Sequence, residues 1–376
     1  MRQPWLTQNS LLQLAEQVLK NFDVNEGDPG PFPAIAQSEH MIVWLVDGMG
    51  SAVLERSVSV NLLPNLSINR SRLKFHTVQS VFPTTTATAL ATLAFAAPPA
   101  VHGALGYTIF LRARNRRVNL LTSCDERNEP VAVRDLYPDL ENVFSRLARH
   151  HVRSAVVGPD LYRHSPLSRW LYRDGRYAGY RNQIEIPGIV SGLLSQGTRY
   201  IFVYTPDFDR AAHASGIESF PAENALVEWD NVFGSAVRLW RTVPSVTLLV
   251  TADHGMVDLN KSQVITQAEP AASALWSHPW AGERRNLFTA LPAHSLSALK
   301  GRGAQIFPQS YLWDCGWYGG PPSRREFRFR VLNTAIVLPS GMQFAMDGSQ
   351  DPPVMLAAHG GITEAEWDIP LIEGNW

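Results

Sequence analysis

The chain has 376 residues, of which 45% are hydrophobic and 18% charged, and its formal net charge is −1 at pH 7. This composition is typical of a globular protein, and the length suits one large α/β domain with an insertion. A nearly neutral chain lacks the basic surface that attracts nucleic-acid polymers or anionic membranes, so we expect neither as a partner.

Apolar patterning along the chain predicts alternating helices and strands. Helices are expected at four segments: 10–22, 140–149, 189–194 and 223–240. Strands are expected at four apolar runs: 41–46, 154–158, 199–204 and 246–250. Strands that alternate with helices predict an α/β fold with a doubly wound, mostly parallel sheet flanked by helices.

Three of the expected strands lead into acidic residues. Asp47 follows the first strand, Asp209 comes shortly after the strand at 199–204, and Asp253 follows the last strand. Because open α/β sheets bind ligands at the carboxyl ends of their strands, we expect these carboxylates along one sheet edge. An Asp-Gly pair after a strand is also an ordinary turn, so Asp47 alone does not indicate a site.

A hydroxyl cluster, Val81-Phe82-Pro83-Thr84-Thr85-Thr86, precedes the small-residue run from Ala87 to Ala97. The run predicts a buried helix, and the cluster would lie at its start. A hydroxyl there has unpaired backbone N–H groups and the positive end of the helix dipole beside it, which suits the binding of an anion or an attack on one. Thr is also a common N-cap residue, so this segment alone leaves both interpretations open.

Histidines accompany the acids. Asp209 and His213 are four residues apart, so on a helix they share one face and can bind one ion. His254 directly follows Asp253, and His359 precedes two glycines near the end of the chain. Each of these pairs taken alone is also explained as a surface pair, a cap or a loop.

Together these groups are sufficient for two adjacent metal ions. The expected ligands are three carboxylates and three imidazoles: Asp47, Asp209, His213, Asp253, His254 and His359. Mixed His/Asp ligation without Cys favours two Zn²⁺ ions, with Mn²⁺ or Fe as alternatives. Two metals about 4 Å apart can clamp the attacking and leaving oxygens of a displacement at phosphorus, and a Thr hydroxyl could attack to form a phosphothreonine. We therefore expect a small-molecule phosphate ester as substrate.

Residues 257–345 differ in character, because they contain several Trp, Gly and Pro clusters. We interpret them as an inserted cap subdomain on a catalytic core formed by 1–256 and 346–376. The aromatic residues of this cap could stack on a nucleobase or fill the cap's own core.

The N-terminal residues contain no apolar signal segment, and the most apolar run, 87–101, is interrupted by prolines and is too short to cross a bilayer. We therefore expect a cytoplasmic protein that makes no membrane contact. The pattern predicts no oligomeric state.

In its ordered motifs the chain resembles the nucleotide pyrophosphatase/phosphodiesterase family of the alkaline phosphatase superfamily, in its compact bacterial form. The matching motifs occur in the family's order between residues 45 and 361: Leu45-Val46-Asp47-Gly48, Phe82-Pro83-Thr84-Thr85-Thr86, His102-Gly103, Asp209 with His213, Thr251-Ala252-Asp253-His254-Gly255-Met256, and His359-Gly360-Gly361. Single motifs are common, but the ordered set is specific.

The resemblance implies two ligand sets, Asp209, His213 and His359 for one ion, and Asp47, Asp253 and His254 for the other. It also implies a nucleophile beside the second ion. The family's Thr lies three residues after the motif's Pro and a fixed distance before His-Gly, which indicates Thr86, with Thr85 as the fallback. Asp207 is not an implied ligand, since only Asp209 keeps the four-residue step to His213.

The chain departs from the family at Tyr107, where characterised diesterases carry an Asn that contacts a phosphate oxygen. A phenol can also donate a hydrogen bond, but its reach differs. Two alternatives to a phosphodiesterase therefore stay open. One is a phosphomonoesterase or phosphonate hydrolase on the same scaffold, and the other is a metal-stabilised binding protein without catalysis.

Overall fold

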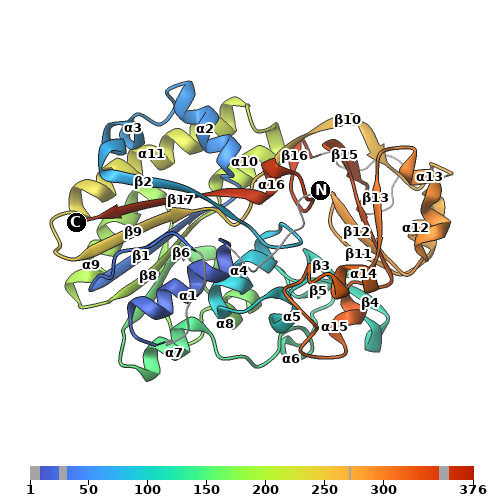
Figure 1. Cartoon of the computed structure of the whole chain (residues 1–376), viewed down its shortest axis with the longest axis horizontal. Helices are drawn as coiled ribbons and strands as arrows, with labels where there is room; N and C mark the ends of the chain where they lie inside the picture. Colours follow the sequence, from blue (N-terminus) through green and yellow to red (C-terminus); the bar gives the residue numbers. More distant parts are fainter. Residues whose placement is uncertain (1–8, 25–31, 271, 347–354) are drawn as a thin grey trace.

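The computed structural model describes residues 9–24, 32–270, 272–346 and 355–376, which form two lobes that are each built on a seven-stranded sheet (Figure 1). The expectation that no signal segment is present concerns residues 1–8, and these lie outside the described residues.

The larger lobe contains the predicted doubly wound sheet. Its strands lie in this order: β2 (Leu73–Gln79), β17 (Asp368–Asn375), β9 (Val246–Thr251), β1 (His40–Val46), β8 (Tyr200–Thr205), β6 (Ser154–Pro159) and β7 (Arg176–Tyr180). From β9 to β7 all neighbours pair in parallel, whereas β17 is antiparallel to both of its neighbours. The prediction of a mostly parallel α/β sheet is confirmed, and so are its four predicted strands.

Helices pack on both faces of this sheet (Figure 1). One group that packs together comprises α1 (Leu11–Asn21), α4 (Thr86–Phe95), α7 (Val143–Arg149) and α8 (Pro166–Leu171). A second group comprises α3 (Pro64–Asn69), α9 (Ile186–Ser195), α10 (Asp207–Ser215) and α11 (Phe220–Trp240), with α2 (Ser51–Ser59) beside β17. The predicted helices at 10–22, 140–149, 189–194 and 223–240 are thus present. The first begins at the expected Ser10, whose side chain forms a capping box with Gln13.

Burial explains why β1 is apolar along its whole length, since all seven of its residues are buried. Its Trp44 packs against Trp229 and Trp240 of α11, with ring centroids 5.9 and 5.8 Å apart. Large aromatic contacts of this kind contribute strongly to the core. They anchor the strand whose carboxyl end carries Asp47.

The most apolar run of the sequence forms α4, in which every residue from Ala87 to Phe95 is buried. A helix enclosed on all sides needs no polar face. Within the ranges given above, no helix combines the length and apolar character required to span a membrane.

The smaller lobe contains the second sheet, with the strand order β13 (Gln305–Pro308), β14 (Thr334–Val337), β12 (Asn286–Thr289), β11 (Trp280–Gly282), β3 (Thr108–Leu111), β4 (Arg116–Asn119) and β5 (Cys124–Asp125). This sheet therefore combines strands from 108–125 with strands from 280–337. The division into a core of 1–256 with 346–376 and a cap of 257–345 remains a prediction.

Short elements surround this second sheet and join the lobes. A three-stranded sheet contains β15 (Gly341–Phe344), β10 (Val257–Ile265) and β16 (Ala357–Ala358). The short helices of this region are α5 (Pro99–His102), α6 (Val133–Leu136), α12 (Ser273–Ser277), α13 (Ser297–Lys300), α14 (Gln309–Asp314) and α15 (Phe327–Arg330), whereas α16 (Glu364–Trp367) packs against α2 and β17 of the larger lobe. The candidate site lies at the carboxyl ends of β1 and β9, beside α10 and the start of α4.

Candidate active site

The central strands of the main sheet end together, and this register gathers the predicted acids. Val46 of β1 pairs with Thr205 of β8, and Leu45 pairs with Thr251 of β9. Asp47 and Asp253 follow these strands closely, while Asp209 lies in the first turn of α10. The three carboxylates therefore lie at one sheet edge, as ligand-binding groups do in open α/β folds.

Asp47, Asp253 and His254 form a fully buried triad whose ligand atoms lie within 4.8 Å of one another. His254 Nε2 is 3.2 Å from Asp253 Oδ2 and 3.5 Å from Asp47 Oδ1. These are the three residues that the resemblance assigns to one ion.

Asp209, His254 and His359 form a second triad with the same spacing. The rings of His254 and His359 stack with their centroids 3.7 Å apart, so His254 takes part in both groups. His213 lies beside this triad on the same face of α10 as Asp209, and its Nε2 is 3.2 Å from Asp209 Oδ1. All six predicted ligands therefore belong to one continuous cluster.

The three histidines share one orientation, since each Nδ1 lies within hydrogen-bonding distance of a backbone carbonyl. The partners are Ala357 O for His213 at 2.8 Å, Thr84 O for His359 at 2.9 Å and Gly255 O for His254 at 3.2 Å. A carbonyl only accepts, so Nδ1 carries the proton and each Nε2 presents a lone pair to the carboxylates. Metal-binding histidines are commonly oriented in this way.

In both Asp253 and Asp47, one carboxylate oxygen accepts hydrogen bonds that orient the side chain. Asp253 Oδ1 accepts the backbone N–H groups of Gly48 and His254 at 3.1 and 3.0 Å, and the Tyr204 hydroxyl donates to Asp47 Oδ2. The opposite oxygens, Asp253 Oδ2 and Asp47 Oδ1, are buried and accept no hydrogen bond within the described part of the chain. Buried carboxylate oxygens without donors are costly unless a cation binds them.

The pKa values of the cluster show the same excess of buried negative charge. Burial raises the pKa of Asp47 well above its usual value, and the neighbouring charges of Asp253 and Asp209 raise it further. Burial alone would also raise the pKa of Asp209, but the neighbouring His213 more than offsets this effect and lowers that pKa to about 2. Burial and the charge of His254 hold the pKa of His359 well below its usual value. A divalent cation would compensate the crowded carboxylates, so the donor set fits a metal.

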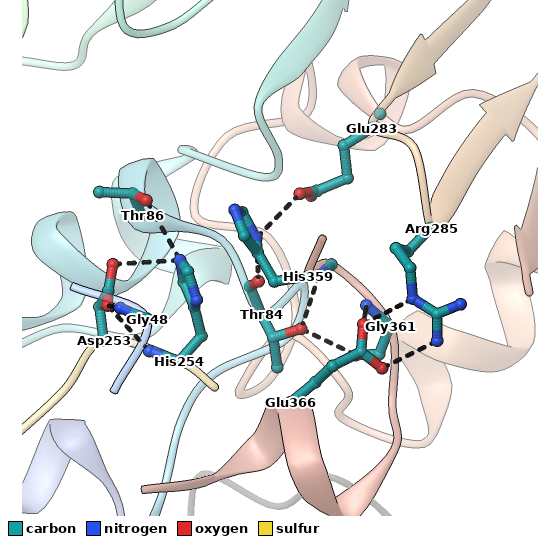
Figure 2. Close-up of polar contacts among 12 residues, drawn as sticks. Gly48, Thr84, Thr86, Asp253, His254, Glu283, Arg285, His359, Gly361 and Glu366 are labelled. Atoms are coloured by element: carbon teal, nitrogen blue, oxygen red, sulfur yellow. Dashed lines mark hydrogen bonds and ion pairs between the residues drawn. The ribbon is translucent and has the colours of Figure 1, made fainter. Parts of the chain in front are cut away.

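The three threonines of the hydroxyl cluster at the start of α4 have different partners. Thr86 is the first residue of α4, is half-buried, and its Oγ1 lies 3.2 Å from His254 Nε2 (Figure 2). Thr85 is the N-cap residue, yet its side chain makes no capping bond and instead hydrogen-bonds Glu283. Thr84 donates to Gly361 O at 2.9 Å and accepts from Gly360 N–H at 3.1 Å. Of the three hydroxyls, only that of Thr86 contacts the cluster of the six predicted ligands, which we call the metal-ligand cluster.

Glu283, at the end of the β11–β12 hairpin, is a site residue that the sequence patterns did not indicate. Its Oε2 lies 3.5 Å from His359 Nδ1, and its Oε1 is buried without a hydrogen-bond partner among the described residues (Figure 2). Gly360 has a φ of +109°, and a Cβ at this position would lie 2.5 Å from Glu283 Cδ. Glycine is thus needed for the close approach. Burial holds the pKa of Glu283 well above its usual value.

A buried ion pair, Arg285 with Glu366, supports the His359 loop. Arg285 Nε and Nη2 donate to the two carboxylate oxygens of Glu366 at 2.8 and 3.0 Å, and both side chains are fully buried. Glu366 also accepts the Gly361 N–H at 2.9 Å (Figure 2). No sequence motif indicated this pair, because its members are 81 residues apart.

A cavity of about 360 Å³ opens beside the cluster. Thr86, Asp209, His213 and His359 contribute to its lining, and so does Tyr107, which is 36% exposed. Tyr107 therefore shares a cavity with Thr86 and three of the candidate ligands. This position is compatible with the substrate-binding role implied by the resemblance.

Comparison with known proteins shows the family and the fold of the chain. Residues 41–303 match the family model described as type I phosphodiesterase / nucleotide pyrophosphatase. No curated protein matches the chain in sequence.

Solved structures similar to this chain include two enzyme groups. Phosphonoacetate hydrolase from Sinorhizobium meliloti 1021 in complex with phosphonoformate shares 16% identity over 90% of this chain and 92% of that chain, with a TM-score of 0.68. Murine ectonucleotide pyrophosphatase / phosphodiesterase 5, an inactive variant in complex with AMP, shares 15% identity over 89% of this chain and 87% of that chain, with a TM-score of 0.67. At these identities the similarity establishes the fold.

Proposed function

This chain belongs to the type I phosphodiesterase / nucleotide pyrophosphatase family, and we propose that it is a dinuclear metal-dependent hydrolase of phosphodiester or pyrophosphate bonds. The resemblance drawn from the ordered motifs is confirmed by this membership. The family acts on phosphoric esters, and the metal dependence and the covalent route described below are our proposal for this chain.

One observation carries the proposal most directly. Three histidines present Nε2 lone pairs to three buried carboxylates, and the Thr86 hydroxyl lies at this cluster, 3.2 Å from His254 Nε2. Asp47, Asp253 and His254 would hold one ion, and Asp209, His213 and His359 the other. Bound divalent cations, Zn²⁺ by preference and otherwise Mn²⁺ or Fe, would lower the pKa of the Thr86 hydroxyl and neutralise charge on the phosphoryl oxygens.

Within this site we assign the chemistry to Thr86. Its Oγ1 loses its proton and forms a bond to phosphorus as the bond to the leaving-group oxygen breaks; that oxygen takes up a proton in turn, which gives a phosphothreonine and releases an alcohol or a phosphate. Water then attacks the same phosphorus and regenerates the hydroxyl. The position of Thr86 at the start of α4 adds backbone N–H groups and the helix dipole, which favour the anionic phosphoryl group.

A second candidate is hydrolysis of phosphonates or phosphomonoesters. It is favoured by Tyr107, which stands where characterised diesterases carry an Asn, and by the similarity to phosphonoacetate hydrolase. A binding protein without catalysis is the third alternative, and it predicts metal binding with no turnover.

The test compares initial rates on bis(p-nitrophenyl) phosphate, p-nitrophenyl phosphate and phosphonoacetate, with metal content measured in the same samples. We expect the highest kcat/KM for the diester in zinc-reconstituted protein. Preferential turnover of the monoester or the phosphonate would select the second candidate. Bound metal with no turnover of any substrate would select the binding protein.

A further inference from the structure

Thr84 belongs to the hydroxyl cluster at the start of α4 but has no role in the chemistry proposed above. Its side chain is buried and does not line the 360 Å³ cavity. It lies two residues before Thr86, the proposed nucleophile, and contacts the loop of residues 359–361 (Figure 2). A buried hydroxyl needs hydrogen-bond partners, and those of Thr84 lie in this loop.

Three hydrogen bonds connect Thr84 to three consecutive loop residues. Its Oγ1 donates to Gly361 O at 2.9 Å and accepts from Gly360 N–H at 3.1 Å. Its backbone carbonyl accepts from His359 Nδ1–H at 2.9 Å. A hydroxyl has one donor and two acceptor sites, so one side chain can make both of the loop contacts at once. Together these bonds fix His359 relative to Thr84.

The loop is also packed closely against two buried glutamates. A Cβ at Gly360 would lie 2.5 Å from Glu283 Cδ, and a Cβ at Gly361 would lie 2.5 Å from Glu366 Oε2. Gly361 N–H donates to Glu366 Oε1 at 2.9 Å. The loop is thus held by Thr84 and by the glutamates, and it has little freedom to shift relative to either.

The proposed ligands form two sets, which we call the Asp47 site (Asp47, Asp253 and His254) and the Asp209 site (Asp209, His213 and His359). Thr86 Oγ1 contacts the Asp47 site directly, 3.2 Å from His254 Nε2. The segment before Thr86 is also attached to this site, because the Ser80 hydroxyl donates to Asp253 O. The contact of the same segment with the Asp209 site is made by Thr84.

The chain between Thr84 and Thr86 is short and ordered. Only two peptide bonds separate the two residues, and Thr85 between them is extended, with φ −138° and ψ 145°. Thr85 N–H donates to Pro83 O at 2.9 Å, and Thr85 O accepts the Ala89 N–H of α4 at 3.0 Å. A displacement of Thr84 would therefore also displace Thr86.

We propose that Thr84 is a positioning residue, which fixes the Thr86 hydroxyl relative to the Asp209 site. The inference deepens the proposed function and rests on it for the role of Thr86. In a two-metal displacement at phosphorus, the nucleophile and both ions act on one phosphoryl group. A misplacement of about 1 Å can lower the rate about 10²-fold. Thr84 would provide this alignment without contacting the substrate.

The first measurement is zinc affinity without substrate. Thr84→Val replaces the hydroxyl by a methyl group, so Gly360 N–H and Gly361 O lose their partner. Competition with a chromophoric chelator gives the two zinc affinities, and we expect one to fall about 10- to 100-fold and the other by less than about threefold. In His213→Ala protein, whose Asp209 site is already weakened, Thr84→Val should change the remaining affinity by less than about threefold.

The second measurement is turnover of bis(p-nitrophenyl) phosphate at zinc concentrations that fill both sites, as confirmed by elemental analysis. Thr84→Val should lower kcat about 10- to 100-fold and change KM by less than about threefold, because alignment is lost and substrate binding is not. Thr84→Ser keeps both hydrogen bonds and should restore kcat to within about threefold of the wild type.

The matched control is Thr88→Val, the same substitution at a fully buried threonine whose Oγ1 has no hydrogen-bond partner in the part of the chain that the structure describes. It should leave both zinc affinities and kcat unchanged. If circular dichroism shows that Thr84→Val is unfolded, Thr84→Ala takes its place with the same expectations, since it leaves more space around the loop.

Three results would each overturn the inference: unchanged zinc affinities, equal weakening of both sites, or a wild-type kcat in the zinc-filled Thr84→Val protein. A loss that Thr84→Ser does not restore would also overturn it. Failure of the proposed function is a separate result that is seen in the wild type alone, namely fewer than two bound zinc ions or no turnover of any phosphorus ester.

Discussion

Two buried groups of charged residues lie on either side of the His359 loop, and they differ in how their charges are balanced. In the metal-ligand cluster, Asp47 Oδ1, Asp209 Oδ1 and Asp253 Oδ2 are buried and accept no hydrogen bond within the described ranges. In the Arg285–Glu366 pair, both carboxylate oxygens accept hydrogen bonds from the guanidinium, and Glu366 binds Gly361 and Thr363 as well.

This difference distinguishes a group of side chains arranged to bind a ligand, the metal-ligand cluster, from one that stabilises the His359 loop, the Arg285–Glu366 pair. A buried pair in which each side-chain nitrogen and oxygen has a hydrogen-bond partner needs nothing further, and it stabilises one arrangement of the loop. A buried cluster with unpaired carboxylate oxygens is unfavourable unless a cation binds it. Removing the cation, the nucleophile or the pair should therefore have separable effects.

Metal removal should have the largest effect. Chelation should abolish phosphoryl turnover and lower Tm, because the ligands come from positions between 47 and 359 and the ions bind only the folded chain. An ion present at about 100 times its Kd adds roughly 2.7 kcal/mol to the free energy of unfolding. Elemental analysis and calorimetry provide the measurement, with about two zinc ions per chain expected after reconstitution. Less than one equivalent would contradict the metal assignment.

Loss of the nucleophile should be the next largest effect. Thr86→Ala should lower turnover of a chromogenic diester on the order of 10³-fold or more, while two metals remain bound. Thr86→Ser keeps the attacking oxygen and should retain part of the rate. The matched control is Thr85→Ala, whose hydroxyl contacts Glu283 and not the metal ligands, and which should be milder. An inactive Thr85→Ala beside an active Thr86→Ala would transfer the role to Thr85.

Breaking the Arg285–Glu366 pair should lower the free energy of unfolding, and we expect this effect to be smaller than those of metal removal and loss of the nucleophile. Glu366→Gln leaves the Arg285 charge buried without a counter-charge, and should lower the free energy of unfolding by about 3–5 kcal/mol. Urea titration of the variant and the wild type gives this quantity. Glu269→Gln, which breaks the more exposed pair with Arg302, serves as the control and should cost less than about 1 kcal/mol. Equal losses in the two variants would remove the distinction between the two pairs.

His102 provides a smaller, pH-dependent effect. It is fully buried, with Nε2 3.0 Å from the Thr92 hydroxyl and Nδ1 accepting from Ala104 N–H at 3.1 Å. The Thr92 hydroxyl donates its hydrogen to Thr88 O, so the imidazole donates from Nε2 and is satisfied in its neutral form. Burial, with a further contribution from the charge of Arg330, lowers the pKa of His102 to about 3 from its usual 6.5.

The sign of this effect follows from proton binding. Between pH 6.5 and 3 the unfolded chain binds a proton at His102 that the folded chain does not, so stability should fall as the pH falls, by up to about 1.4 kcal/mol per pH unit. His102→Gln cannot be protonated, so its free energy of unfolding should decrease less between pH 6.5 and 4.5. Urea unfolding of both chelator-treated proteins measures the two slopes. Parallel slopes would show that His102 does not titrate on unfolding.

Much of the main sheet could be predicted from the sequence, because continuous apolar runs such as Met41 to Val46 are explained only by burial on both faces. The order of the second sheet could not be predicted in this way. Its strands are two to four residues long and come from two distant segments, so no local periodicity announces their pairing.

The sequence by itself identified the candidate ligands and the candidate nucleophile, because Asp47 and Asp253 follow apolar runs, Asp209 and His213 are four residues apart, and the remaining candidates stand in motifs that resemble those of the family. Only the tertiary structure decided what surrounds that chemistry. Gly282-Glu283-Arg284-Arg285-Asn286 has the composition of an exposed turn, yet its three charged side chains line the cavity or are buried. The physical reason is that a buried charge is tolerated only beside its partner, and the partner of Arg285 is Glu366, 81 residues further along the chain.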